Sequence, residues 1–241
     1  MDHLKPIKLN QKQSGHYYSE MPQEYSVSYY PNKGGTYVIE IDDEIAHVSQ
    51  FQTAIQVLNM AKEDDEVEIR LSCCPGGSVD AGDTMLHAMR KTQAHIKIVA
   101  SGGVHSMGTH ILLEADEFEL SGGFNALIHC GSNGAYGAVN EYVAKSKFDL
   151  DFRTRQFREA YEGFLTEKEI EEVLEGKDIW LDGEDWCARA MARMQYFQDK
   201  IDSFKKEAQK AARKPRAKKT ITKEQIQGIK EAFDKPEKSS V

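Results

Sequence analysis

The sequence predicts an α/β fold, because strand-like and helix-like segments alternate from residue 36 to residue 130. Residues 36–41 (TYVIEI) are a β-branched run, which is typical of a strand. Residues 51–61 repeat apolar side chains at helical spacing, and residues 66–71 alternate apolar and charged side chains as a half-buried strand does. Alternation of this kind is characteristic of α/β proteins.

The elements after residue 71 continue this pattern. Pro75-Gly76-Gly77 is a turn signal, and so is Gly102-Gly103. The segments expected around these turns are a helix through residues 85–89, a strand at 96–100, a short helix at 106–114, and strands at 117–120 and 125–130.

The second half of the sequence is mostly helical. A Gly-rich stretch at 131–137 precedes a long charged helical pattern at 138–164. Thr166 and Glu169 have the spacing of a capping box, which predicts a helix that ends at Gly176. Asp182 is positioned to cap the Ala-rich helix that follows it.

The chain therefore divides into three parts. Residues 1–33 show no clear periodicity and are interpreted as an N-terminal arm, and residues 34–198 form the main domain. Residues 199–241 form a basic, partly disordered tail, with 13 Lys and Arg against 7 Asp and Glu. The rest of the chain has 18 basic and 32 acidic residues, so an acidic body carries a basic tail. Such a body should repel nucleic acid, and the tail alone could attract an acidic partner.

Composition excludes several classes of protein. With 241 residues, 40% hydrophobic and 29% charged, the chain is neither collagen-like, wholly disordered nor a disulfide framework. No segment approaches the run of about 18 apolar residues that a transmembrane helix needs, and the start lacks a signal-peptide core. A cytoplasmic location and no membrane contact are expected. The cysteines lack zinc-ligand spacing, so no metal and no cofactor are expected; they are Cys73, Cys74, Cys130 and Cys187.

Three features in this order could support acyl transfer. The glycine turn at 75–77 exposes backbone N–H groups that can stabilise an oxyanion. Ser106 begins a helix, where the helix dipole favours negative charge. His129 ends a strand and could accept the serine proton. Each feature alone has a plainer interpretation: a simple turn, an N-cap serine and a structural histidine.

Together these segments resemble the proteolytic subunit of the Clp protease. The resemblance lies in Leu71–Gly82 (LSCCPGGSVDAG), Gly103–Gly108 (GVHSMG) and Leu127–His129 (LIH). The family has a Ser-Pro-Gly-Gly turn, a nucleophile in an Ala-Ser-Met-Gly setting and a Met-Ile-His base. The spacing of 29 positions between Gly77 and Ser106 suits the family without a gap. The similarity covers roughly residues 37–191.

The resemblance implies a role for each matching residue. Ser106 is the expected nucleophile and His129 the general base, and the amides of Gly77 and Met107 form the oxyanion hole. The family's acid lies just before an aromatic residue, which Asp178-Ile-Trp matches. Asp178 is therefore the expected acid, with Asp182 as the alternative.

Some positions depart from the family pattern. His105 stands where a small residue usually precedes the nucleophile, and we expect it to point away from Ser106. Cys73-Cys74 replaces a polar pair, and Cys74 is expected to be a small buried residue and not a nucleophile. Cys130-Gly131 replaces Gln-Pro after the base, so the following loop is expected to differ.

The resemblance also implies a fold and an assembly. The fold is the β-β-α spiral shared by the Clp protease and crotonase families, with a helical handle at about residues 131–165. The subunits are expected to form heptameric rings, stacked into a barrel, that hydrolyse protein or peptide substrates. Gly131, Gly134 and Gly137 are expected to form a substrate-binding edge strand. The expected partner is an AAA+ unfoldase or, for a bacteriophage-type member inside a procapsid, a capsid or scaffold protein.

Two other functions remain open from the sequence. A catalytically inactive subunit of a mixed ring could keep the fold, and the changes at His105 and Cys130 leave room for it. A crotonase-type acyl-CoA enzyme would share paired backbone amides for an oxyanion but would not need the Ser106–His129 pair.

Overall fold

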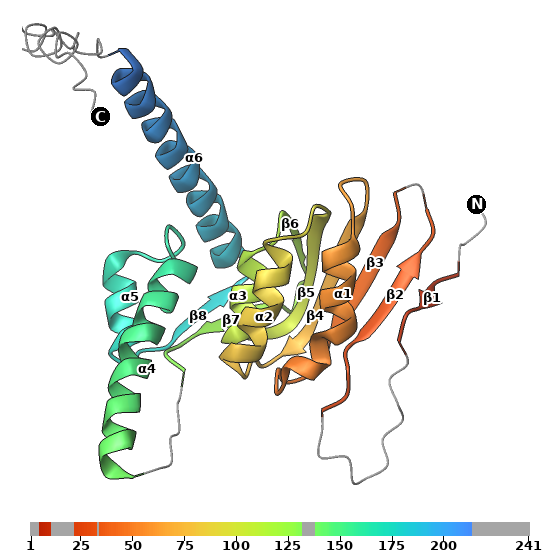
Figure 1. Ribbon diagram of the computed structural model, residues 1–241, viewed down its shortest axis with the longest axis horizontal. Helices are drawn as coiled ribbons and strands as arrows, with labels where there is room; N and C mark the ends of the chain where they lie inside the picture. The colour runs from red at the N-terminus through yellow and green to blue at the C-terminus, as the bar shows by residue number, and fades with distance from the viewer. Residues whose placement is uncertain (1–4, 11–21, 33, 132–137, 214–241) are drawn as a thin grey trace, which may run out of the picture. The chain divides into compact units, whose positions relative to one another are not determined.

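The fold is known from a computed structural model that describes residues 5–10, 22–32, 34–131 and 138–213. Within these residues, eight strands form one mixed sheet in the order β1-β2-β3-β4-β5-β7-β8, with β6 also paired to β5 (Figure 1). Helices alternate with its central strands, so the α/β prediction is confirmed. None of the helices in these ranges is long and apolar enough to cross a membrane.

The centre of the sheet is parallel and its two ends are antiparallel. β3, β4 and β5 run parallel, whereas β2 pairs antiparallel with β3, and β8 pairs antiparallel with β7. The strands are β1 (Ile7–Lys8), β2 (Ser26–Tyr30), β3 (Thr36–Ile41), β4 (Glu66–Cys74), β5 (His95–His105), β6 (Glu117–Leu120), β7 (Asn125–Ile128) and β8 (Ile179–Asp182).

The predicted strand at 125–130 is shorter in the structure, because β7 ends at Ile128 and His129 lies just beyond it. The region around Gly102 also differs from the sequence prediction. The turn expected at Gly102-Gly103 is wrong, because β5 runs unbroken through both glycines to His105. Gly102 has φ +66°, which lets the strand bend without ending. The first half of β5 pairs with β6 and the second half with β7. The bend therefore carries the end of β5 to β7, directly before Ser106.

The hydrophobic core lies between this sheet and the helices that cover one of its faces (Figure 1). Ile39, Ile69 and Ile98 from the three central strands are fully buried, and Leu58 and Met85 pack against them from the helices. The helices are a 3-10 turn (Val48–Phe51), α1 (Gln52–Met60), α2 (Val79–Met89), α3 (Met107–Leu113), α4 (Val139–Ala160), α5 (Glu167–Leu174) and α6 (Gly183–Arg213).

The helix signals in the second half of the sequence are confirmed. The Thr166 side chain accepts from the Glu169 N–H, and the Glu169 carboxylate accepts from the Thr166 N–H, as in a capping box. Asp182 Oδ1 accepts from the Asp185 N–H at 2.9 Å and so caps α6. Gly176 has φ +101° just after α5, as expected of a glycine that ends a helix.

Regular structure extends into parts of both predicted terminal segments. Residues 26–30 of the predicted N-terminal arm form β2, and Tyr25 and Val27 are buried beside it. The chain divides into two units, Met1–Phe197 and Gln198–Val241, and the boundary falls within α6. The predicted tail thus begins inside a helix that continues to Arg213. Residues 1–4, 11–21 and 214–241 lie outside the described residues.

Candidate active site

Ser106 sits at a strained turn between a strand and a helix. It follows β5 directly and is the N-cap of α3, with φ +51° and ψ −122°. A non-glycine residue with positive φ is uncommon, and the strain persists only where the surrounding structure imposes it. A strand–turn–helix elbow of this kind exposes the side-chain oxygen of a nucleophilic serine. Ser106 is half-buried.

Backbone and side-chain bonds hold this elbow on both sides. The Ser106 N–H donates to the carbonyl oxygen of Leu127 in β7 at 2.8 Å. The Ser106 carbonyl accepts from the Thr109 N–H at 2.9 Å and from the Thr109 hydroxyl at 2.6 Å. Both peptide groups of Ser106 are therefore bonded, which accounts for its strained geometry.

The glycine turn lies against the elbow. A Cβ atom placed on Gly76 would stand 2.7 Å from the Ser106 Cβ and 2.9 Å from the Met107 nitrogen. Only glycine permits this approach, because real Cβ atoms essentially never come closer than 3.0 Å to another heavy atom. The turn predicted from Pro75-Gly76-Gly77 and the helix predicted from Ser106 thus meet in space.

Gly77 is fixed by a single parallel bridge to Ile45. The Ile45 N–H donates to the Gly76 carbonyl at 2.8 Å, and the Ser78 N–H donates to the Ile45 carbonyl at 2.6 Å. In such a bridge the central residue turns its own N–H away from its partner. The Gly77 N–H therefore faces away from Ile45. The Met107 N–H, in the first turn of α3, has no acceptor within that helix.

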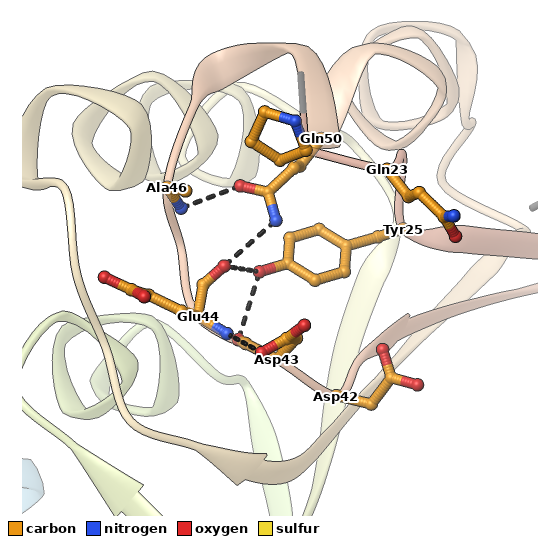
Figure 2. Close-up of a pocket in the computed structure, with 8 residues that line it drawn as sticks. Gln23, Tyr25, Asp42, Asp43, Glu44, Ala46 and Gln50 are labelled. Atoms are coloured by element: carbon orange, nitrogen blue, oxygen red, sulfur yellow. Dashed lines mark hydrogen bonds between the residues drawn. The ribbon is translucent and has the colours of Figure 1, made fainter. Parts of the chain in front are cut away.

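The segment that carries Ile45 is itself braced by two buried side chains (Figure 2). The Tyr25 hydroxyl donates to the Glu44 carbonyl at 3.0 Å, and burial raises the pKa of Tyr25 well above its usual range. The Gln50 amide donates to the same carbonyl at 2.9 Å and accepts from the Ala46 N–H at 2.7 Å. These residues line a cavity of about 250 Å³. The brace fixes the Glu44–Ala46 segment, on which the Gly76–Ser78 turn rests.

His129 and Asp178 lie at one end of the β7–β8 ladder. The last paired residues of that ladder are Ile128 and Ile179. His129 follows Ile128, and Asp178 precedes Ile179, so each residue lies one position beyond the last registered pair. His129 is half-buried and Asp178 is exposed.

The side chains of the three residues are not linked in the isolated chain. Among the described residues, no hydrogen bond joins Ser106 to His129 or His129 to Asp178. The backbone segments of Ser106 and His129 are nevertheless joined, since the Ser106 N–H donates to the carbonyl of Leu127, two residues before His129.

The structure also shows the surroundings of three further residues from the sequence analysis. Asp182 caps α6 and pairs with Asn125, at the opposite end of the ladder from His129. His105 Nε2 lies 2.9 Å from Asn125 Oδ1, and its ring packs edge-on against Trp180. Cys74 is fully buried, and burial raises the pKa of its thiol to about 11. Cys74 is therefore a buried thiol, as expected.

Residues 32–188 match the family model described as Clp protease. The chain belongs to the Clp protease family. The match spans well over half of the 241 residues and includes the glycine turn, Ser106, His129 and Asp178. Within the described residues, the mixed sheet and six α-helices agree with the Clp-protease-like spiral predicted above. Clp proteases are peptidases, and members of the family typically assemble into rings.

Some residues near this Clp-family site have no signal in the sequence. Thr109 and Tyr161 are buried, and their hydroxyl oxygens lie 2.6 Å apart beside Ser106. His110 packs edge-on against Tyr161, and burial, aided by Arg90 and Arg193, lowers its pKa to about 4. Thr109 follows the nucleophile by three residues, but Tyr161 is 52 residues further on, so only the fold reveals the pair.

The remaining site expectations concern the loop after β7. Gly131 is exposed and belongs to no strand in the structure. Gly134 and Gly137, which were expected to extend a substrate-binding strand from it, lie outside the described residues. No group of three or more His, Cys, Asp or Glu residues suited to a metal ion occurs within the described ranges.

Proposed function

We propose that this Clp-family chain is a serine endopeptidase in which Ser106 is the nucleophile, His129 the general base and Asp178 the acid. The observation that carries this function is the strained backbone of Ser106, a non-glycine residue at φ +51° between a strand and a helix. Strain of this kind clusters at active sites, because it aims a reacting atom that an ordinary turn would not expose.

The reaction proceeds through an acyl-enzyme. The Ser106 Oγ attacks the carbonyl carbon of the scissile peptide bond while His129 takes the hydroxyl proton. The oxyanion accepts hydrogen bonds from the N–H groups of Gly77 and Met107. The C–N bond then breaks, and His129 returns the proton to the leaving amine. Water, deprotonated by His129, hydrolyses the ester and restores Ser106.

Asp178 holds the imidazole of His129 in the tautomer that accepts the serine proton. Its support is the shared β7–β8 ladder, which ends one residue short of both groups. Catalytic hydrogen bonds are often long in the free enzyme and tighten in the working complex, so the Asp178–His129 bond is expected to form there.

We propose that the working form is a ring-shaped oligomer in which α4 is the handle. Only Phe157 is buried on this 22-residue helix. A helix that exposes so much apolar surface favours a further contact. The exposed large apolar side chains of α4 are Val139, Tyr142, Val143, Phe148, Leu150 and Phe152.

The test of catalysis is covalent labelling of the intact protein with a fluorophosphonate, followed by mass measurement. Wild type should gain one adduct, and Ser106→Ala should gain none. Sedimentation of the same samples reports the assembly. An adduct that persists in Ser106→Ala would exclude Ser106 as the nucleophile, and monomer under all conditions would exclude the ring.

A second candidate is a catalytically inactive subunit of a mixed ring. It is favoured by the lack of side-chain hydrogen bonds among Ser106, His129 and Asp178 in the described chain. In that case assembled wild type should resist the fluorophosphonate at every concentration. Labelling that appears only in the assembled fraction would instead support an enzyme whose triad aligns on assembly.

A further inference from the structure

A buried chain of hydroxyl groups links the end of α4 to the carbonyl of Ser106. Thr109 and Tyr161 are 0% and 1% exposed, and their hydroxyl oxygens are 2.6 Å apart. The Thr109 hydroxyl also lies 2.6 Å from the Ser106 carbonyl oxygen. Tyr161 is the C-cap of α4, so a residue 55 positions from Ser106 in the sequence is joined to it by two hydrogen bonds.

The direction of these hydrogen bonds follows from the number of available protons. A threonine hydroxyl has one proton, and a carbonyl oxygen can only accept. The Thr109 proton is therefore donated to the Ser106 carbonyl. Tyr161 must then donate its own proton to the Thr109 oxygen. Burial raises the pKa of Tyr161 well above its usual range, which keeps the phenol protonated as this role requires.

The linked hydroxyl groups of Tyr161 and Thr109 hold the peptide group between Ser106 and Met107. In the proposed reaction, the N–H of this peptide group binds the oxyanion. The carbonyl of Ser106 and the N–H of Met107 belong to the same planar unit. Fixing the direction of the carbonyl therefore fixes the direction of the N–H, which points the opposite way. The strained ψ of −122° at Ser106 is the torsion that sets this direction. A carbonyl that accepts two hydrogen bonds is also polarised, and this strengthens its N–H as a donor.

We propose that Tyr161 is a positioning residue which, through the hydroxyl of Thr109, holds the Ser106–Met107 peptide so that the Met107 N–H is presented to the substrate oxyanion. This role rests on the proposed serine-peptidase function. Tyr161 touches neither the substrate nor the reacting atoms.

The surroundings of Tyr161 suit a fixed phenol. Its ring packs against Phe157 at 4.6 Å and against the edge of His110 at 5.0 Å between ring centroids. Its carbonyl accepts from the N–H groups of Phe164 and Leu165, so its backbone is also held. Tyr161→Phe should keep these contacts and remove only the hydroxyl, which makes it the natural test.

The experiment compares Tyr161→Phe, Thr109→Val and Thr109→Ser with wild type in the hydrolysis of a fluorogenic peptide. Tyr161→Phe and Thr109→Val should each lower kcat by about 10- to 100-fold with KM nearly unchanged, since removing an oxyanion donor outright costs about 100- to 1000-fold. Thr109→Ser keeps the hydroxyl and should retain most of the activity. Leu58→Val, in the core at α1, controls for a general loss of stability.

The double variant Thr109→Val/Tyr161→Phe tests whether Tyr161 acts through Thr109 or whether the two residues act independently. The hydrogen-bonded path from Tyr161 through Thr109 to the Ser106 carbonyl is called the relay below. Residues that act in one chain are non-additive, so the double variant should be no slower than Thr109→Val alone. It should also be more stable than Thr109→Val, because it leaves no buried phenol without a partner. Additive losses of kcat would overturn the relay, and so would a kcat within about twofold of wild type in Tyr161→Phe.

A second readout does not need activity. The Thr109 N–H donates to the Ser106 carbonyl, which the relay holds in place. Amide hydrogen exchange in a proteolytic fragment that contains residues 106–109 should therefore be faster in Tyr161→Phe and Thr109→Val than in wild type. Unchanged exchange overturns the relay even if wild type proves inactive. Failure of wild type to react with a fluorophosphonate would instead count against the proposed function.

Discussion

The backbone N–H of Ser106 donates a 2.8 Å hydrogen bond to the carbonyl oxygen of Leu127, two residues before His129. This bond joins the start of α3 to the end of β7. It extends the pairing of β5 with β7, whose last pair is His105 and Leu127. The proposed nucleophile and base therefore sit on adjacent, bonded backbone segments, although 22 residues of chain separate them.

His129→Ala should lower peptide hydrolysis by about a thousandfold or more, because it removes the group proposed to accept the serine proton. Initial rates on a fluorogenic peptide measure the effect. His105→Gln is the matched control and should stay within a fewfold of wild type, since His105 already contacts Asn125 and Trp180. Equal losses in both variants would point to a structural effect on the elbow.

Asp178→Asn should lower kcat by about 100- to 10,000-fold, because an amide stabilises the wrong tautomer of His129. Thermal unfolding should be almost unaffected, since the Asp178 side chain is exposed. Asp182→Ala should show the reverse pattern: a loss of about 1 kcal/mol of stability from the α6 cap, with kcat preserved. A larger loss of kcat in Asp182→Ala than in Asp178→Asn would make Asp182, and not Asp178, the catalytic acid.

Gly77→Ala should abolish hydrolysis almost completely, beyond the effect of one lost oxyanion donor. Gly77 has φ +134°, and a Cβ there would lie 2.3 Å from the Ile45 carbonyl oxygen. Because this neighbour is backbone, the whole turn has to shift. Gly122→Ala, where a Cβ would meet nothing within 4 Å, is the control and should leave activity unchanged. Initial rates of peptide hydrolysis measure the activity of both variants, and circular dichroism checks that both are folded. Activity in Gly77→Ala equal to that of Gly122→Ala would contradict the prediction.

Glu169→Gln should lower stability by about 1–2 kcal/mol at neutral pH, because Arg189 donates two hydrogen bonds to this carboxylate. The Arg189 guanidinium, together with the Thr166 cap, lowers the pKa of Glu169 from 4.5 to about 2. A depressed carboxyl pKa stabilises the fold above pH 4.5, and this contribution disappears as the pH falls towards 2.

Urea unfolding of both proteins from pH 7 down to pH 2 measures this difference. The gap between wild type and Glu169→Gln should close across that acidic range. Glu175→Gln removes the same charge from the C-cap of α5, where the carboxylate neither caps the helix N-terminus nor binds Arg189, and it should show a smaller gap. A Glu169→Gln gap that is independent of pH would contradict the ionic origin of the effect.

Thiol reagents should spare Cys74 in the folded protein. It is fully buried, and burial raises its pKa to about 11, so almost no thiolate is present at pH 8. Exposed Cys73 and Cys130 should react first, as peptide mapping after brief iodoacetamide treatment can show. Preferential labelling of Cys74 would reopen the case for a cysteine nucleophile.

Local patterns in the sequence were enough to predict most of the elements around the site. The β-branched run before Ile41, the glycine turn at 75–77 and the capping box at Thr166 each depend on neighbours within a few residues. The turn expected at Gly102-Gly103 was wrong for the same reason. A glycine pair signals a turn locally, but here the pairing of β5 with β7 keeps the backbone extended.

The sequence alone determined which chemical groups this chain offers: a serine before a helix, a histidine after a strand and a glycine turn. The tertiary structure decided how they meet. The strained φ of Ser106, the approach of Gly76 to within contact of it, and the hydroxyl chain from Tyr161 all depend on residues far apart in the sequence. Such contacts form only when the sheet and its helices pack, because burial of the core supplies the free energy that holds a strained turn in place.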